Sequence, residues 1–83
     1  MRDAQTTQFK TSFGKRLRQL RARRGLSQEE LANRANLHRT YVSDCERGER
    51  NPSLVSIRAL AQGLEVHPGE LLKDPDDADD SAR

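Results

Sequence analysis

The chain has 83 residues, of which 34% are charged and 33% hydrophobic, and it contains no tryptophan. A chain of this size and composition has room for one small core, which excludes a second folded unit and a deep ligand cavity. The formal net charge is only +2, but residues 10–73 contain 13 lysines and arginines against 7 acids, whereas residues 74–80 contain five aspartates and no base. A basic folded part suits a polyanionic partner such as nucleic acid, and equally a solvated helix surface.

Two helices are predicted in the first half of the chain. The first spans residues 13–24, and its apolar positions recur at helical spacing: Phe13, Leu17 and Leu20. Gly25 can end this helix in a left-handed conformation. The second helix spans residues 28–35, because Ser27 and Glu30 have the spacing of a capping box, in which each side chain accepts a hydrogen bond from the other residue's backbone N–H.

A third helix is predicted over residues 39–47, after a sharp turn at Asn36 and before a stop at Gly48. Two helices of about eight residues are not stable alone, so packing must fix their arrangement. Val42 and Cys45 are the residues that we expect to point inward. Two short helices joined by a short turn have the spacing of a helix-turn-helix motif.

The last two helices are expected at residues 54–63 and 68–73. Apolar residues trace one face of the earlier helix, namely Leu54, Ile57, Leu60, Ala61 and Leu64, and a proline suits the first position of the later one. Residues 1–9 and 74–83 are polar, so we expect a disordered N-terminal arm and an acidic disordered tail. The sequence therefore predicts an all-α fold of five helices in one domain over residues 10–73.

Polar residues of the third helix remain on its outer side when Val42 and Cys45 face the core. A step of about 100° per residue places four of them on the opposite and flanking faces: Arg39, Thr40, Ser43 and Asp44. Arginine can donate two hydrogen bonds to guanine, threonine offers a hydroxyl and a methyl group, and aspartate can accept from cytosine or orient a neighbouring arginine. These side chains are candidates for contacting the edges of DNA bases.

The stretch SQEELANRANLHRTYVSDCERGERNPSL, residues 27–54, resembles the DNA-binding helix-turn-helix of the phage repressor and Cro family, often called the XRE family. Within it, RTYVSDCERGERN is similar to the small controller proteins of restriction-modification systems, and the resemblance runs from about Phe13 to Leu72. It implies a five-helix, lambda-repressor-like DNA-binding domain. It also implies a homodimeric, sequence-specific transcriptional regulator that binds a palindromic operator, with a recognition helix at about 39–47 in the major groove.

The resemblance implies roles for single residues as well. The positions that face bases are Arg39, Thr40, Ser43 and Asp44. The positions near the DNA backbone are Gln28, Tyr41, Arg47, Arg50 and Asn51, and the pair expected to form an interior salt bridge is Arg21 and Glu46. For the dimer interface we expect apolar residues in excess of what so small a core can bury: Leu64, Val66, Leu71 and Leu72.

Two other functions fit the same sequence. One is an antitoxin or phage-type repressor with a protein partner, and the other is a protein-interaction module that has the same fold and does not bind DNA. The acidic tail has two interpretations as well, because it can solubilise the chain or compete with DNA for the basic surface.

No catalytic site is predicted. His38, for which we assign no role, and His67 are far apart in the sequence, and there is no glycine-rich phosphate loop or carboxylate pair. Cys45 is the only cysteine, which excludes an intramolecular disulfide and a cysteine-based metal site, and we expect it to be a small buried hydrophobe. No apolar run is long enough for a membrane span. We therefore expect a cytoplasmic DNA-binding protein with no metal, cofactor or small-molecule ligand.

Overall fold

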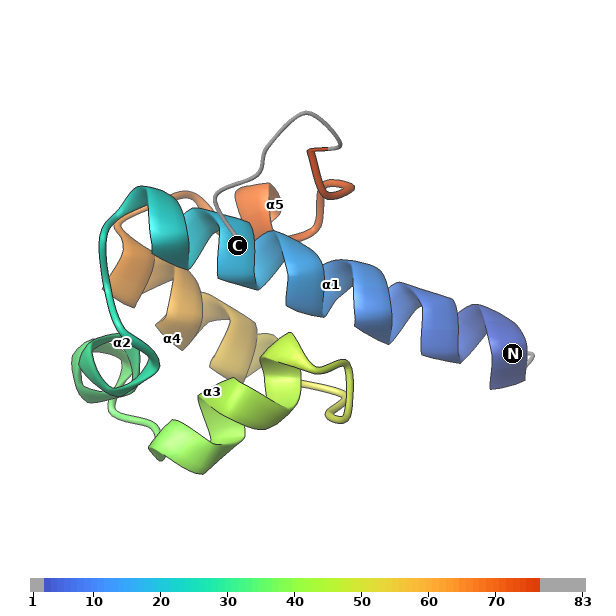
Figure 1. Ribbon diagram of the computed structural model, residues 1–83, viewed down its shortest axis with the longest axis horizontal. Coiled ribbons are helices and arrows are strands. Elements are labelled where there is room, and N and C mark those ends of the chain that lie inside the picture. Colours follow the sequence, from blue (N-terminus) through green and yellow to red (C-terminus); the bar gives the residue numbers. More distant parts are fainter. Residues whose placement is uncertain (1–2, 77–83) are drawn as a thin grey trace.

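The computed structural model describes residues 3–76 of the chain. These residues form five helices and no strand: α1 (Asp3–Arg23), α2 (Gln28–Ala35), α3 (Arg39–Glu46), α4 (Leu54–Leu64) and α5 (Pro68–Leu71). Figure 1 shows α1 as the long axis of the molecule, with α3 and α4 on one side of it and α5 on the other. The expected all-α, five-helix fold is confirmed.

The first helix differs most from its prediction, because α1 begins at Asp3, ten residues before the expected start. Residues 3–9, which we expected to be disordered, are therefore helical, and they extend beyond the body of the domain (Figure 1). No proline or glycine interrupts this stretch, and the acidic Asp3 in the first turn suits the positive end of the helix dipole. The rest of the predicted arm, residues 1–2, lies outside the described part of the chain.

The expected local signals of the helix-turn-helix are confirmed. The Ser27 hydroxyl accepts a hydrogen bond from the Glu30 backbone N–H at 3.0 Å, and the Glu30 carboxylate accepts one from the Ser27 N–H at 2.8 Å. Asn36 ends α2 in the left-handed conformation, with φ of 57°. The chain then enters α3 within three residues, so α2 and α3 pack directly against each other.

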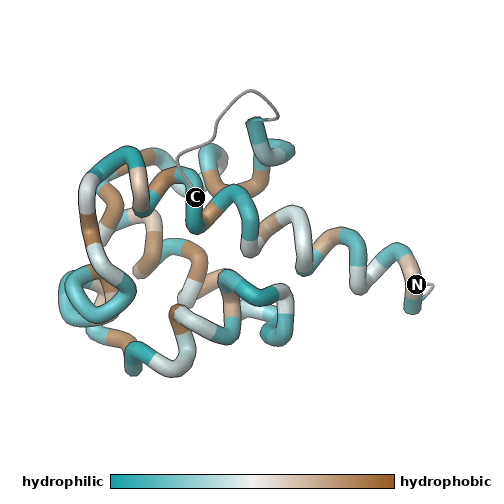
Figure 2. The backbone as a smooth tube through the Cα atoms, viewed as in Figure 1, coloured by the Kyte–Doolittle hydropathy of each residue, from teal (hydrophilic) through white to brown (hydrophobic). Residues whose placement is uncertain are grey.

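One core holds the helices together. Its buried residues come from all five helices and the turn after α1: Phe13, Leu17, Leu20, Leu26, Leu31, Ala32, Ala35, Val42, Cys45, Leu60, Ala61, Leu64 and Leu71. Figure 2 shows hydrophobic residues, in brown, where the helices face one another, and hydrophilic residues, in teal, over much of the remaining backbone. Among residues 3–76, no helix combines the length and the apolar character needed to cross a lipid bilayer.

Two buried polar side chains of α1 hold α5 and the segment that follows it. Arg16 Nε donates to the Glu70 carbonyl at 2.8 Å, and its Nη2 pairs with the Glu70 carboxylate at 3.0 Å. Gln19 donates to the Asp76 carbonyl and accepts from the Asp76 N–H, both at 2.9 Å. The start of the predicted acidic tail is thus attached to α1, across that helix from α3 (Figure 1), and residues 77–83 lie outside the described part of the chain.

Candidate nucleic-acid interface

A glycine on α1 sets the position of α3. A Cβ at Gly14 would lie 2.4 Å from the Cys45 carbonyl oxygen and 2.6 Å from that of Glu46. These separations are far below van der Waals contact, so only glycine allows α1 and α3 to approach this closely. The C-terminal end of α3 is therefore held against the backbone of α1.

The ion pair expected between Arg21 and Glu46 is present at the same junction. Arg21 donates from Nη2 to Glu46 Oε1 at 3.0 Å and from Nε to the other carboxylate oxygen, while Nη1 donates to the Leu26 carbonyl at 2.7 Å. Only 16% of the Arg21 side chain and 4% of the Glu46 side chain are exposed. Gln28 Nε2, at the start of α2, also donates to Glu46 at 3.1 Å. This network fixes α3 relative to both preceding helices.

The two sides of α3 differ as the sequence predicts. Val42 and Cys45 are fully buried, and burial raises the pKa of the Cys45 thiol to about 11, so the thiol is neutral at pH 7. Arg39 and Thr40 are exposed at the first turn of α3. Within residues 3–76, neither of these two side chains makes a hydrogen bond or an ion pair, so both can contact a molecule that approaches α3.

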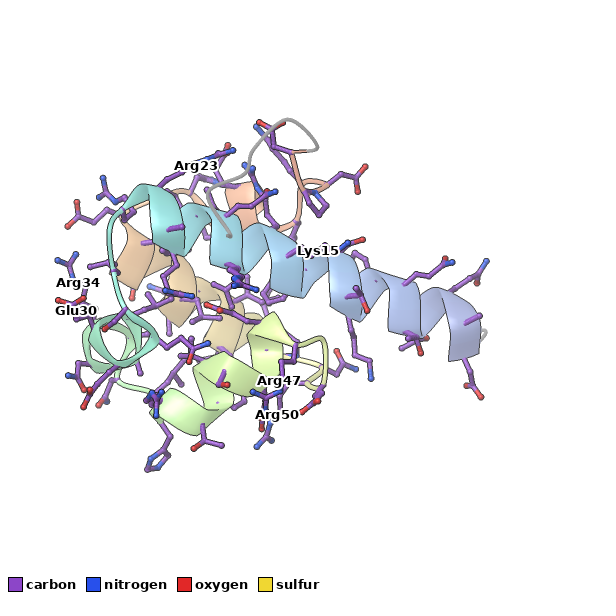
Figure 3. All side chains as sticks on the ribbon, in the orientation of Figure 1. Lys15, Arg23, Glu30, Arg34, Arg47 and Arg50 are labelled. Carbon is purple, nitrogen blue, oxygen red and sulfur yellow. The ribbon has the colours of Figure 1, made fainter. Side chains whose placement is uncertain are left out.

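Three charged residues near the end of α3 form a second ion-pair network, which we call the Asp44 cluster: Asp44, Arg47 and Arg50. Asp44 Oδ1 accepts from Arg47 Nη2, and Oδ2 accepts from Arg50 Nε at 3.4 Å. The Arg47 guanidinium also donates to the Ser43 hydroxyl and to the Glu49 carboxylate at 3.3 Å. Figure 3 shows Arg47 and Arg50 side by side below the end of α3.

A tight turn positions the second arginine of this cluster. Gly48 adopts φ of 76°, and the Glu49 N–H donates to the Asp44 carbonyl at 2.9 Å, which closes the end of α3. A Cβ at Gly48 would lie 3.1 Å from the Thr11 Cα, so the turn also packs against α1. Arg50 then lies with its guanidinium carbon 5.0 Å from the centroid of the Tyr41 ring, a cation–π distance.

The other residues predicted to contact DNA differ in exposure and in hydrogen bonding. Asn51 is exposed and lines a hollow with Phe9 and Lys10 of α1, and Tyr41 is half-buried beneath Arg50. The Gln28 amide group, expected near the DNA backbone, is bonded to Glu46 instead of being free. His38 is the N-cap residue of α3, but its side chain makes no capping hydrogen bond.

Two of the four residues expected at a dimer interface are wrongly assigned. Leu64 and Leu71 have no exposed surface, because α4 and α5 pack them into the core of their own chain. Val66 is half-buried and packs against that core, and only Leu72 is largely exposed. The core thus contains more residues than the sequence suggests, because α4 and α5 both pack over it.

The exposed apolar surface includes residues that sequence reasoning missed, and we call it the apolar face: Phe9, Leu54, Val55 and Leu72. Leu54, which the helical spacing places on the inward side of α4, is 80% exposed, and Val55 is 76% exposed. Both lie in the first turn of α4, beyond the end of the core. Leu72 lines shallow hollows together with Phe9 on one side and with Leu54 and Val55 on the other, so the four residues are contiguous.

Comparisons with known proteins agree on one family. The helix-turn-helix domain family matches residues 12–74. Control protein C.BamHI of Bacillus amyloliquefaciens is 46% identical over 68 residues, which are 81% of this chain and 84% of that protein. Control protein C.MunI of a Mycoplasma species is 42% identical over 67 residues, 80% of this chain and 90% of that protein.

A solved structure has the same fold. The restriction-modification controller protein C.AhdI from Aeromonas hydrophila aligns with a TM-score of 0.74 at 53% identity, over 75% of this chain and 94% of that one. The helix-turn-helix family match begins at residue 12, so it does not include the first turns of α1, which starts at Asp3.

Proposed function

This chain belongs to the helix-turn-helix family of DNA-binding transcriptional regulators, in the group of restriction-modification controller proteins, and we propose that it binds a palindromic operator as a homodimer with α3 in the major groove. The observation that carries the proposal is the pair of exposed side chains Arg39 and Thr40, which have no partner among residues 3–76, on a helix whose position is fixed by buried contacts. Rigid presentation of polar groups favours specific contacts, because little conformational entropy is lost on binding.

The residues of the interface divide into two roles. Arg39 has the geometry to donate two hydrogen bonds to a guanine, and Thr40 and Ser43 offer hydroxyl groups to neighbouring bases. Arg47, Arg50 and Asn51, with Tyr41 beneath Arg50, lie near the C-terminal end of α3, where they would contact phosphates. Gln28 has its amide nitrogen engaged by Glu46, so a phosphate contact there would use the backbone amides at the start of α2.

The homodimer follows from the limits of one recognition helix. Each correctly paired base contributes about 1–3 kcal/mol of discrimination, so one helix cannot select a single site in a genome. Two copies related by a two-fold axis would place their α3 helices on half-sites about 34 Å apart. We propose that the apolar face supplies the contact between the copies, because its exposed apolar residues form a contiguous surface at the start of α4 and after α5.

Binding measurements with the Arg39→Ala variant test the proposed interface. A duplex selected from a random pool and an unselected duplex are titrated with the wild-type protein, Arg39→Ala and Lys15→Ala. Arg39→Ala is expected to lose about 1–3 kcal/mol on the selected duplex only. Lys15→Ala removes the same charge from an exposed position on α1, which lies apart from Arg47 and Arg50 in Figure 3, and should affect neither duplex strongly. Equal losses of Arg39→Ala on both duplexes would reject base reading by this residue.

Sedimentation at tens of micromolar tests the dimer. The wild-type protein is expected to sediment as a dimer, and the double variant Leu54→Ser, Val55→Ser as a monomer that stays folded, because both side chains are largely exposed. A monomeric wild-type protein would reject the dimer.

The salt dependence of binding tests the alternative function. A DNA-binding protein should lose affinity for duplex DNA steeply as the salt concentration rises, and the lack of such a loss would favour a protein-interaction module.

A further inference from the structure

We propose that Asp44 does not contact a base, and that its carboxylate instead positions Arg47 and Arg50 against the DNA backbone. This inference rests on the proposed function, and it changes the role of one of the four residues expected to face bases. Asp44 has 18% of its side chain exposed, whereas about half of each arginine side chain is exposed. The two guanidinium groups therefore lie between the carboxylate and the solvent.

Both oxygens of the carboxylate already have a partner. Oδ1 accepts from Arg47, the residue that follows α3, and Oδ2 accepts from Arg50, which follows the turn at Gly48. A contact between Asp44 and the amino group of a cytosine would need at least one of these ion pairs to open. It would also bring a carboxylate that has lost part of its counter-charge close to the phosphates of the groove, which is electrostatically unfavourable.

The two arginines keep donors that Asp44 does not use. A guanidinium has five N–H donors, and Arg50 uses only Nε in contacts within residues 3–76. Its plane is further fixed by the Tyr41 ring at 5.0 Å. Arg47 is held by Ser43 as well as by Asp44. Asp44 thus restrains two long, otherwise mobile side chains while leaving donors available for phosphate oxygens, whose geometry suits guanidinium groups.

The consequence for recognition is a difference between two kinds of DNA. On the operator, phosphate contacts at fixed positions set the register of α3 in the groove, so restrained arginines favour the correct base contacts. On random DNA, mobile arginines neutralise phosphates equally well. Loss of the carboxylate should therefore weaken operator binding and leave non-specific binding unchanged or stronger, because the protein also loses a negative charge.

The test compares Asp44→Asn with Glu49→Gln on the selected duplex and on an unselected duplex. Glu49 is a matched control, since it also pairs with Arg47 and carries the same charge, but it is more exposed and contacts one arginine of the cluster. We expect Asp44→Asn to weaken operator binding about tenfold, a typical size for coupled neighbours. Glu49→Gln should leave operator binding nearly unchanged, and neither variant should weaken binding to the unselected duplex.

Two further measurements separate positioning from base reading. In a background with Arg47→Gln and Arg50→Gln, Asp44→Asn should have no further effect, because the residues through which it acts are gone. Selection of duplexes from a random pool should give the same preferred bases for Asp44→Asn as for the wild-type protein, with lower discrimination at every position. Unchanged helix content and thermal unfolding of Asp44→Asn would show that the domain remains intact.

Three results would overturn the proposal: a changed base preference at one position only, an equal loss in the double-arginine background, or an equal loss for Glu49→Gln. Wild-type protein that binds no duplex would reject the proposed function itself, and this inference with it. The wild-type titration therefore distinguishes the two failures.

Discussion

Helix α3 carries two arginine–carboxylate networks that differ in burial. Glu46 and Arg21 lie at the junction with α1, where almost all of their surface is excluded from solvent. Asp44, Arg47 and Arg50 lie on the other side of the same helix end, where both guanidinium groups are about half exposed. The buried pair also receives a hydrogen bond from Gln28 and donates one to the Leu26 carbonyl, so its polar atoms are satisfied by the protein alone.

The difference in burial separates stability from binding. Removing one partner of a buried ion pair leaves an uncompensated charge, which is costly, whereas an exposed pair is screened by water and contributes little to folding. The same chemistry can therefore fix α3 to α1 at one place and provide adjustable donors for phosphates at another. Four substitutions, in order of expected effect on stability, test this division.

The largest effect is expected from Glu46→Ala. Arg21 would remain mostly buried without its counter-charge, and Gln28 would lose its acceptor. We expect the free energy of unfolding to fall by about 3 kcal/mol, the lower end of the range for breaking a buried pair. Urea titration followed by circular dichroism measures this value. A loss below that of the exposed-cluster variant Asp44→Asn would contradict the comparison.

Gly14→Ala tests whether the α1–α3 junction is as rigid as the buried pair requires. The new Cβ would meet backbone carbonyl oxygens at 2.4 and 2.6 Å, which a rotamer change cannot relieve. We expect a destabilisation of about 2 kcal/mol, typical of overpacking. Lys15→Ala, at the neighbouring exposed position, is the control and should be nearly neutral. A stable Gly14→Ala variant would show that α3 can shift away from α1.

The capping box at the start of α2 is an intermediate case, because its carboxylate is exposed but bonded to fixed backbone. Ser27→Ala should lower the free energy of unfolding by about 1 kcal/mol, as loss of an N-cap usually does.

Hydrogen bonds from Ser27 lower the pKa of Glu30 below its usual value of 4.5. A carboxylate with a lowered pKa stabilises the fold above its unfolded pKa, and this contribution is lost as pH falls through the folded pKa. The difference in stability between wild-type and Glu30→Gln proteins, measured by urea titration, should therefore shrink toward pH 3.

The smallest effect on stability is expected from Asp44→Asn. Its two ion pairs involve half-exposed arginines, so the free energy of unfolding should change by less than about 1 kcal/mol. The same urea titration measures it beside Glu46→Ala. A loss of several kcal/mol would mean that the Asp44 cluster is structural, and it would remove the distinction between the two networks.

Local signals in the sequence predict much of the fold. The capping box of Ser27 and Glu30 and the left-handed turn at Asn36 depend on neighbouring residues, so spacing alone locates α2 and the turn before α3. The start of α1 is not predicted because its first turns are polar and lack apolar residues at helical spacing, although no helix-stop signal interrupts them. The burial of Leu64 and Leu71 was missed because it depends on how α5 folds back over the core, which no local pattern specifies.

The candidate interface was predictable in part. Helical spacing places Arg39 and Thr40 outside once Val42 and Cys45 face inward. Helical spacing does not indicate with which partner a charged side chain will pair. Asp44 could have faced a base or an arginine, and only the turn at Gly48 brings Arg50 back to within reach of its carboxylate.

The double hydrogen bond between Gln19 and the Asp76 backbone has a consequence for experiments in solution. The Asp76 amide lies outside every helix, yet it is bonded to the side chain of a buried residue. Its hydrogen should exchange with deuterium more slowly than loop amides normally do. In Figure 1 the segment after α5 lies across α1 from α3. Slow exchange that persists when operator DNA is added would therefore show that anchoring of the acidic segment and binding of DNA by α3 are independent events.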